Sequence, residues 1–586
     1  MLSVSSPEQK TLHTALALGG ALCLLLALSM PNMVIPADVH TDAGQVRWLE
    51  ATGLGAVFWL LCAALLGRLW LVLALAVPVA LFWPLELWLR LYNGTPISPQ
   101  LAALALESNW AEGANFFSAY GDGLVWLAVA WMLLYATGLW AAWRLDVRWH
   151  HRSRVYVLVI FVPVLALMHQ SQSTHDALGA DFALDALDDP AISGWAFQWA
   201  EVYPLNLPLA LVHFRQQQDK LQHLQASLAG RSLQAQQPAL ADNPEVVVLV
   251  IGESASATRW GLLGYERDTT PLLKQQPGLV AFHDVVALSA ATRSAVPGVL
   301  SRRPVLQPTG TINLQAEPSL VQAFAQVGYQ THWLSNQSPM GQHDTSISLY
   351  AREAADVRFL NPANYQHRSQ LDEVLLAPLH DALAQPGRHL VVLHLLGSHF
   401  DYALRYPVSF DHFQPSLQSE PPQPAGERYA EQLTNSYDNS LRYTDHVLAQ
   451  VLNAVQQRGG KAVVAYFSDH GVDPSQGQCS SQTPNRRSEA AYRVPAFVWL
   501  SEPLRTQAPA QWQRLQDNAR QPYTTRALYA TLLGLAHIDV AGGLPAESFL
   551  QPPARPLPPR MVASTSGRLV DFDKARQKSA CFIVAD

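Results

Sequence analysis

Two carboxylates and one histidine each follow an apolar run of the chain, and together they form a possible metal site. The run Val246–Ile251 leads to Glu253, and the run Ala462–Phe467 leads to Asp469 and His470. Open α/β sheets place their ligands at the carboxyl ends of such strands. Two carboxylates and one imidazole suit zinc. For either run taken alone, a strand that ends in a solvated acid is the competing interpretation.

A threonine between the two runs adds a possible nucleophile. Thr292 lies in the stretch Ser289–Leu300, just before a predicted helix start and five residues ahead of Pro297. A hydroxyl becomes nucleophilic when a metal ion lowers its pKa, and a helix N-terminus favours phosphate oxygens. The pattern therefore indicates phosphoryl chemistry.

The elements that must position these residues alternate between strands and helices from Glu245 onward. This alternation predicts a doubly wound α/β domain, because parallel strands buried on both faces are continuous apolar runs. The predicted strands are Val246–Ile251, Thr331–Leu334, Leu390–His394, Ala462–Phe467 and Pro495–Leu500. The predicted helices are Ser294–Arg302, Pro318–Val327, Glu373–Ala384, Ala430–Gln457 and Thr525–Leu533.

The first third of the chain is far more apolar than the rest. Charged residues make up only 15% of the whole sequence, and the net charge of −7 gives no indication of nucleic-acid binding. Five apolar runs predict a bundle of five transmembrane helices, with a buried all-helical core as the alternative. The runs are Leu12–Ile35, Ala51–Leu66, Leu69–Leu85, Gly123–Trp143 and Val155–Met168.

The basic loops predict the orientation of this bundle. Arg144–Arg154 is the most basic loop, so we expect it on the cytoplasmic side, and Lys10 before the first span agrees. With five spans, the chain after about residue 170 then lies outside the cytoplasm. The segment Tyr92–Asp122 has helical spacing of apolar residues and is predicted to lie at the membrane surface.

Several motifs, in order along the chain, resemble the membrane-bound bacterial phosphoethanolamine transferases of the alkaline phosphatase and sulfatase superfamily. The motifs are GES and GYERDTTP near residue 253, the threonine at 292, HLLGSH before residue 400, SYDN near residue 437 and FSDHG at 467–471. The longer stretch HLLGSHFDYALRYP is most similar to the branch that modifies the lipopolysaccharide core. The resemblance covers most of the chain.

The resemblance implies a reaction and a ligand set. Phosphoethanolamine would pass from phosphatidylethanolamine to a lipopolysaccharide, at a core sugar or lipid A, through a zinc-activated threonine. Zinc would be held by Glu253, Thr292, Asp469 and His470, with Thr292 as the nucleophile. A phosphoethanolamine-threonine intermediate would then deliver its group to a sugar hydroxyl.

Four further residues match positions that contact substrate in the resembled family. His399 would line the site and bind substrate or a second metal. Ser338, Ser108 and Glu112 would contact the lipid donor. From the residues alone, a turn serine at Ser338 and a solvated helix face at Ser108 and Glu112 remain open.

The same resemblance implies a domain plan and a location in the bacterial inner membrane. Residues 1–170 would form the five-helix transmembrane domain, 171–243 a periplasmic connector with interfacial helices, and 244–586 the periplasmic catalytic domain with a sulfatase-like fold. Cys479 and Cys581 lie in this last part. An oxidising periplasm would permit them to pair, and the sequence leaves both states open.

The chain also departs from the resembled family, and this keeps alternatives open. The family carries an acid directly after DHG and a histidine further on, whereas this chain reads DHGVDPS and has no histidine from Val472 to Ala536. A phosphoglycerol transferase or a hydrolase of the same superfamily is one alternative. A relative that binds lipids without catalysis is another, although Glu253, Thr292, Asp469 and His470 are all present.

Overall fold

The structure, a computed structural model, describes eleven segments: 23–34, 42–92, 110–149, 152–159, 202–212, 230–337, 346–361, 370–420, 427–474, 487–564 and 567–584. It also describes the single residues 20, 97, 215, 219, 224, 228 and 479. The chain divides into two compact units, and most of the residues after Gln216 belong to the second. Each unit is described by itself.

The first unit is built from long apolar helices. Two of its helical stretches, Leu69–Leu91 and Leu124–Arg144, are long and apolar enough to cross a membrane by length and composition. Two shorter apolar helices lie at Cys23–Met33 and Ala51–Leu66. The long helices of this unit are α2 (Asp42–Leu66), α3 (Leu69–Tyr92) and, from Phe117 onward, α5 (Trp110–Arg144).

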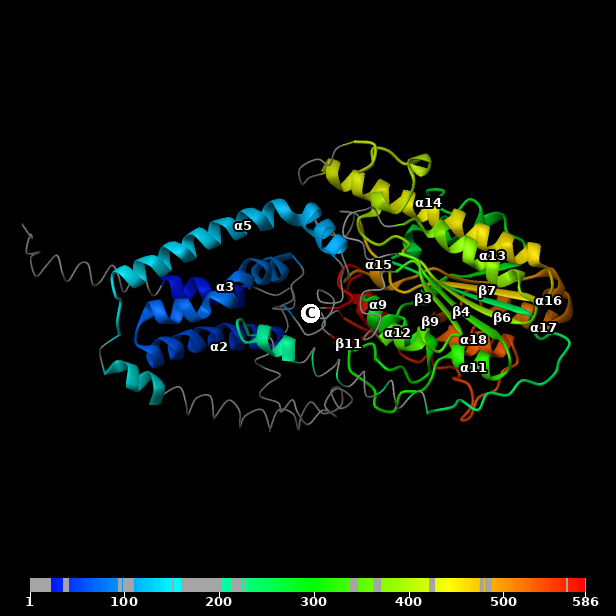
Figure 1. Ribbon diagram of the computed structural model, residues 1–586, viewed down its shortest axis with the longest axis horizontal. Helices are drawn as coiled ribbons and strands as arrows, with labels where there is room; N and C mark the ends of the chain where they lie inside the picture. Colours follow the sequence, from blue (N-terminus) through cyan, green and yellow to red (C-terminus); the bar gives the residue numbers. More distant parts are fainter. Residues whose placement is uncertain are drawn as a thin grey trace, which may run out of the picture. The chain divides into compact units, whose positions relative to one another are not determined.

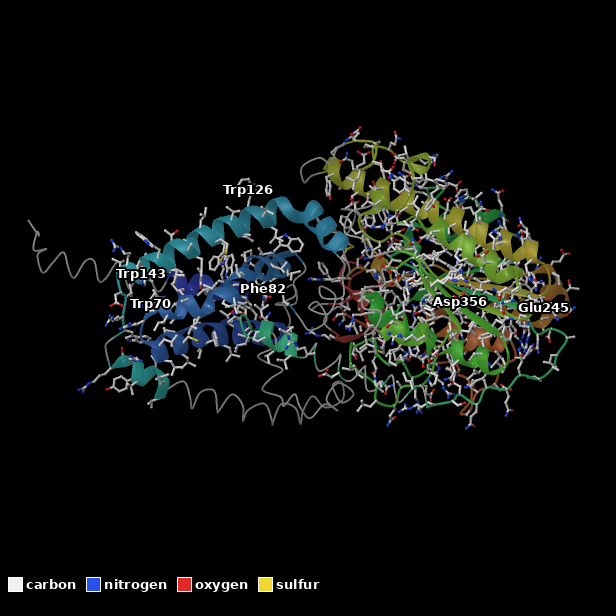
Figure 2. The ribbon with its side chains drawn as sticks, in the orientation of Figure 1. Trp70, Phe82, Trp126, Trp143, Glu245 and Asp356 are labelled. Atoms are coloured by element: carbon white, nitrogen blue, oxygen red, sulfur yellow. A yellow bond between two sulfur atoms is a disulfide. The ribbon has the colours of Figure 1, made fainter. Side chains whose placement is uncertain are left out.

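Aromatic side chains on α5 are exposed, as expected for a helix with lipid around it. Trp126 is 72% exposed and Trp143 is 59% exposed, and both point away from the helix in Figure 2. Trp131, on the same helix, is buried and stacks on Trp83 of α3 with ring centroids 3.9 Å apart. One face of α5 is therefore packed within the unit, and the other presents large apolar groups to its surroundings.

Two of the five predicted runs thus form helices that meet the length and composition of a span. The first and second predicted runs contain the shorter apolar helices, and only residues 155–159 of the fifth run lie in the described part. The number of five spans stays a prediction. The described part of the predicted surface segment, from Trp110 onward, belongs to α5 and continues into the span.

The second unit is organised around a seven-stranded sheet (Figure 1). The five strands from β7 to β5 run parallel, whereas β8 pairs antiparallel with β7, and β2 pairs antiparallel with β8. In spatial order the strands are β2 (Leu279–Phe282), β8 (Ala496–Leu500), β7 (Ala462–Ser468), β1 (Val246–Gly252), β6 (His389–His394), β4 (Gln330–Ser335) and β5 (Asp356–Phe359).

Helices cover both faces of this sheet, so its central strands are buried on both sides (Figure 1). Alternate residues of β1 enter different cores because successive side chains of a strand point to opposite faces. Val248 packs in the core formed with α13 and α14, and Leu249 packs in the core on the other face. The first face carries α13 (Leu376–Ala384) and α14 (Glu427–Arg458); the second carries α10 (Pro297–Leu300), α11 (Leu320–Gln326), α12 (Ser346–Ala351) and α18 (Ala527–Leu535).

Smaller elements complete the unit. Two strand pairs are separate from the main sheet: β3 (Asp284–Val286) with β9 (Pro522–Thr524), and β10 (Met561–Ala563) with β11 (Leu569–Asp571). The remaining α-helices are α9 (Thr292–Ala295), α15 (Glu489–Tyr492), α16 (Glu502–Gln507), α17 (Pro509–Asn518) and α19 (Phe572–Lys578).

All five predicted strands are present, with two differences of detail. The predicted strand Pro495–Leu500 is β8, which is antiparallel, so the sheet is mixed. The predicted helix Ser294–Arg302 is two single turns, α9 and α10, which meet at Pro297. Proline lacks an amide hydrogen and cannot continue the hydrogen bonding of the preceding turn.

The two C-terminal cysteines, whose pairing the sequence leaves open, are paired in the structure. Cys479 and Cys581 form a disulfide with 5.0 Å between their Cα atoms and 102 residues between them in sequence. The bond links the segment that follows His470 to the end of the chain.

Candidate active site

The carboxyl ends of two neighbouring parallel strands bring the predicted metal ligands together. Strand β1 pairs with β7 so that Gly252 lies opposite Ser468. The residue directly after β1 is Glu253, and the residues directly after β7 are Asp469 and His470. Parallel strands end at the same edge of a sheet, so this register alone places the three side chains side by side.

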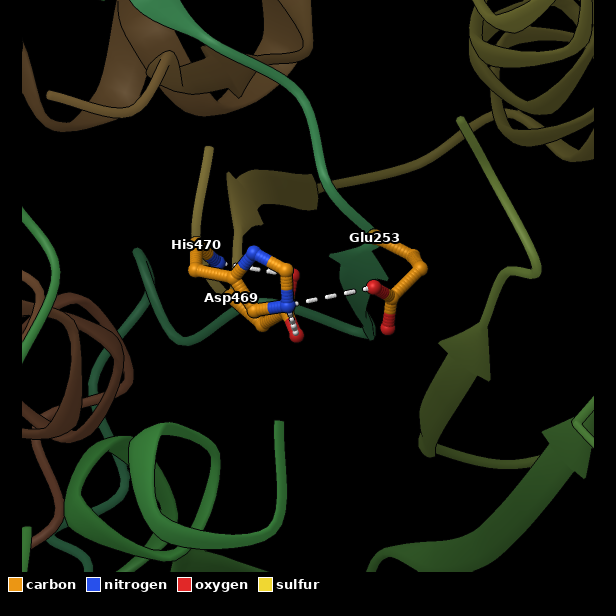
Figure 3. Close-up of side chains that lie close together, drawn as sticks. All are labelled: Glu253, Asp469 and His470. Carbon is orange, nitrogen blue, oxygen red and sulfur yellow. Dashed lines mark hydrogen bonds and ion pairs between the residues drawn. The ribbon is translucent and has the colours of Figure 1, made fainter. Parts of the chain in front are cut away.

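Glu253, Asp469 and His470 form a compact cluster (Figure 3). Each offers one ligand atom, and these atoms all lie within 4.8 Å of one another. The His470 Nε2 atom is 3.4 Å from Glu253 Oε1 and 3.5 Å from Asp469 Oδ2. All three side chains are almost fully buried.

Hydrogen bonds fix which ligand atoms face the centre. His470 Nδ1 lies 3.0 Å from the Gly471 carbonyl oxygen, which can only accept, so Nδ1 carries the proton and Nε2 presents its lone pair. Asp469 Oδ1 accepts hydrogen bonds from the backbone amides of Ser254 at 3.0 Å and His470 at 2.7 Å. The other oxygen of Asp469, Oδ2, therefore faces the cluster.

The chemistry of this cluster fits a bound cation. Asp469 Oδ2 is buried and accepts no hydrogen bond from any residue that the structure describes. Two buried carboxylates beside one imidazole are costly unless a positive charge compensates them. Two oxygen ligands and one nitrogen ligand form a donor set that zinc accepts, with a fourth position open for a hydroxyl or water. The residues present therefore fit the zinc expected from the sequence.

The Thr292 hydroxyl lies beside this cluster. It is the first residue of α9, and its hydroxyl donates to Glu253 Oε2 at 3.0 Å and lies 3.5 Å from His470 Nε2. Thr292 is half-buried, whereas the three possible ligands are buried. The hydroxyl is thus the accessible member of the group. The sequence predicted that a helix N-terminus at Thr292 would favour phosphate oxygens. Helix α9 has only one turn, so its length does not support this expectation.

His399 lies beyond β6 but does not belong to the cluster. Its Nδ1 atom is 2.8 Å from the Phe400 carbonyl oxygen, and its own carbonyl oxygen accepts from Arg405 Nε at 2.9 Å. The loop before it is held by Asp372, whose carboxylate accepts from the amides of Leu396 and Gly397, each at 2.8 Å. Burial raises the pKa of Asp372. The sequence does not reveal this role of Asp372, because a single acidic residue in a predicted helical segment has no spacing that indicates a function.

For the three residues predicted to contact the lipid donor, the structure describes no side chain. Ser338 and Ser108 lie outside the described residues, and for Glu112 only the backbone is described, in the first turn of α5. Their assignment stays a prediction.

Comparison with known proteins gives a family for the second unit. Residues 245–538 match the family model described as Sulfatase. The chain is 30% identical over 319 residues to phosphoethanolamine transferase EptC of Escherichia coli K12, covering 53% of this chain and 54% of that protein. It is 30% identical over 311 residues to the Kdo(2)-lipid A phosphoethanolamine 7''-transferase of the same strain, covering 51% and 53%. The chain spans about half the length of the curated relatives it matches.

Two solved structures are similar in fold. The C-terminal periplasmic domain of E. coli EptC in complex with Zn has a TM-score of 0.52 at 26% identity, covering 59% of this chain and 98% of that one. The integral membrane protein lipooligosaccharide phosphoethanolamine transferase A of Neisseria meningitidis has a TM-score of 0.60 at 18% identity, covering 90% of this chain and 96% of that one. The second similarity concerns the fold alone, and it extends over both units.

Proposed function

We propose a transferase function for this chain, which belongs to the sulfatase family. In this proposal it transfers phosphoethanolamine from phosphatidylethanolamine to a lipopolysaccharide, at a core sugar or at lipid A. Two relatives that are 30% identical are named phosphoethanolamine transferases, and one of them is named for lipid A. The observation that carries the proposal is the Thr292 hydroxyl, 3.0 Å from Glu253 within a cluster of buried ligands.

In this proposal Glu253, Asp469, His470 and the Thr292 hydroxyl would hold one zinc ion. When bound, zinc lowers the pKa of the hydroxyl and offsets the charge of the phosphate oxygens. The O/O/N donor set supports this choice of metal, as does the zinc complex of the similar E. coli domain.

Thr292 acts as the nucleophile of the first step. Its Oγ1 attacks the donor phosphorus, a new bond forms between these two atoms, and the bond from phosphorus to the diacylglycerol oxygen breaks. The hydroxyl proton leaves toward Glu253 Oε2, to which the hydroxyl already donates at 3.0 Å. The departing oxygen takes a proton from His399 or from water.

The second step regenerates the threonine. A sugar hydroxyl of the acceptor attacks the phosphorus of the threonine adduct, and the bond from phosphorus to Oγ1 breaks. The sugar hydroxyl gives its proton to His399 or to water, whichever gave one in the first step, and Oγ1 takes back the proton held at Glu253 Oε2, so the enzyme returns to its starting state. A sulfatase mechanism with an oxidised cysteine does not fit, because the sequence contains no CxPxR motif, and in this proposal Thr292 takes the place of that cysteine.

A lipid donor places the enzyme at a membrane. The apolar helices of the first unit, including the two candidate spans, support a multi-pass inner-membrane protein. With the basic loop Arg144–Arg154 in the cytoplasm, the catalytic unit lies in the periplasm, where the acceptor is accessible. The disulfide Cys479–Cys581 is consistent with an oxidising compartment.

Mass spectrometry of lipopolysaccharide tests the function. Cells that express the chain are compared with cells that lack it, and we expect lipopolysaccharide that carries added phosphoethanolamine only in the first. Added phosphoglycerol would instead establish the alternative transferase. An unchanged lipopolysaccharide alongside free phosphoethanolamine would indicate a hydrolase, and no change in either would favour a lipid-binding relative.

A further inference from the structure

The turn that follows Glu253 has a backbone conformation that must be held from outside. Ser254 has a φ of +57°, in the left-handed region that residues with a side chain rarely adopt. Such a conformation persists only where the surroundings stabilise it. Ser254 directly follows the ligand Glu253 and donates its amide to Asp469 Oδ1 at 3.0 Å. The shape of this turn therefore sets where two metal ligands point.

A tyrosine on α14 forms two hydrogen bonds to the backbone of this turn. The Tyr437 hydroxyl donates to the Ser254 carbonyl oxygen at 2.7 Å and accepts from the Ser256 amide at 2.9 Å. Tyr437 is fully buried, and burial raises the pKa of its hydroxyl, which therefore keeps the proton that it donates. One oxygen atom thus satisfies two backbone groups of this turn, the carbonyl of the left-handed residue Ser254 and the amide two residues later.

The same face of α14 holds Glu253 through a second loop. Ser440 lies three residues after Tyr437, so the two side chains are neighbours on one helix face. Ser440 Oγ is hydrogen-bonded to Ser398 Oγ at 2.8 Å, and the Ser398 amide donates to the Glu253 carbonyl oxygen at 3.0 Å. The Glu253 carbonyl oxygen and the turn that follows it are therefore both held by contacts that begin on one turn of α14.

We propose that Tyr437 is a positioning residue, which orients Glu253 for metal binding by holding the left-handed turn at Ser254. The proposal rests on the metal chemistry of the proposed function. Tyr437 lies on a segment far from both ligand-bearing strand ends in sequence, and its hydroxyl contacts backbone atoms of the turn. Outer partners of this kind tune metal affinity because they fix the orientation of the ligands.

The substitution Tyr437→Phe removes one oxygen atom and retains the ring in the core. A matched control exists at Tyr350 of α12, which is also fully buried. Its hydroxyl accepts from the Val305 amide at 2.9 Å and donates to the Glu317 carbonyl oxygen at 3.4 Å. Tyr350→Phe therefore removes the same two kinds of hydrogen bond away from the metal ligands.

The experiment measures metal binding by the full chain in detergent. Wild type, Tyr437→Phe and Tyr350→Phe are stripped with a chelator and titrated with Zn²⁺ in competition with a chromophoric chelator. The visible absorption of the Co²⁺ form reports the geometry of the ligands. We expect Tyr437→Phe to weaken Zn²⁺ binding by about 10- to 100-fold and to shift the Co²⁺ spectrum. Tyr350→Phe should match wild type in both.

Every outcome decides the proposal. Wild-type affinity and spectrum in Tyr437→Phe, or equal losses in both variants, would overturn it, as would a wild type that binds no zinc. If Tyr437→Phe does not fold, Ser440→Ala tests the same helix face, with a shifted Co²⁺ spectrum expected and an unchanged one contradicting the proposal. Transfer to lipopolysaccharide is measured separately, so tight zinc binding without transfer would reject the proposed function and leave this inference standing.

Discussion

Gly397 lies against Glu253 so closely that no side chain fits between them. A Cβ atom on Gly397 would lie 2.7 Å from the Glu253 carbonyl oxygen and 2.9 Å from its amide nitrogen. Gly397 also has a φ of +50°. The loop that leads to His399 is therefore packed directly on the backbone of a metal ligand, and this contact gives the most specific prediction about the fold of the site.

Gly397→Ala should abolish most of the transfer activity, because the added methyl group must displace the backbone of Glu253. Gly459→Ala is the control: Gly459 also has a positive φ, of +73°, but its Cβ would meet nothing within 4 Å. The left-handed conformation alone costs about 1–2 kcal/mol, and both variants share that cost. Transfer assays and zinc content on both variants separate the clash from the strain. Equal activity in the two variants would contradict the contact.

The ligand inventory predicts about one tightly bound zinc per chain. Glu253, Thr292, Asp469 and His470 form one complete set. A second zinc beside His399 needs protein ligands of its own, and no second histidine for it occurs from Val472 to Ala536. Asp473 could supply a carboxylate, but the following Pro474 stiffens its loop. His537 lies just beyond that stretch, but its Nε2 is 3.0 Å from Asp242 Oδ2. Elemental analysis after dialysis against a mild chelator measures the number, and two retained zinc ions would mean that another residue completes a second site.

Glu353 should make the stability of the second unit depend on pH. Its carboxylate accepts from the Ser319 amide at 2.9 Å, and burial raises its pKa to about 7. Since the folded-state pKa is raised, the unfolded chain releases the proton first, and stability falls as the pH rises from about 4.5 to about 7. Above and below this window the contribution is constant.

Urea unfolding at several pH values checks this slope. Glu353→Gln should flatten it within the window, and Glu502→Gln, at an exposed position, should leave it unchanged. The assignment would be refuted if the wild-type urea midpoint rose from pH 4.5 to pH 7 and the midpoint of Glu353→Gln rose equally.

The fold was predictable where burial on both faces leaves a mark in the sequence. Strands β1, β6 and β7 are buried at every position, so they are uninterrupted apolar runs. The edge strand β5 has no fully buried residue and was missed. The direction of β8 was beyond prediction, because an antiparallel strand buried on both faces has the same apolar pattern as a parallel one.

The site was predictable to the extent that its residues terminate strands. Glu253, Asp469 and His470 directly follow β1 and β7, and the register of these strands brings them together. Tyr437 was not predictable as a support, because its role depends on how α14 packs over the turn at Ser254. A buried tyrosine within an amphipathic helix has the same pattern whether its hydroxyl holds an active-site turn or not.

Thr292→Ala is the test of Thr292 as the nucleophile. The variant should fold and insert into the membrane, since Thr292 is half-buried at the start of a single helical turn. The measurement is phosphoethanolamine on lipopolysaccharide, by mass spectrometry, from cells that express wild type or variant at equal membrane levels. We expect the modification to disappear with Thr292→Ala. Undiminished modification by that variant would contradict it.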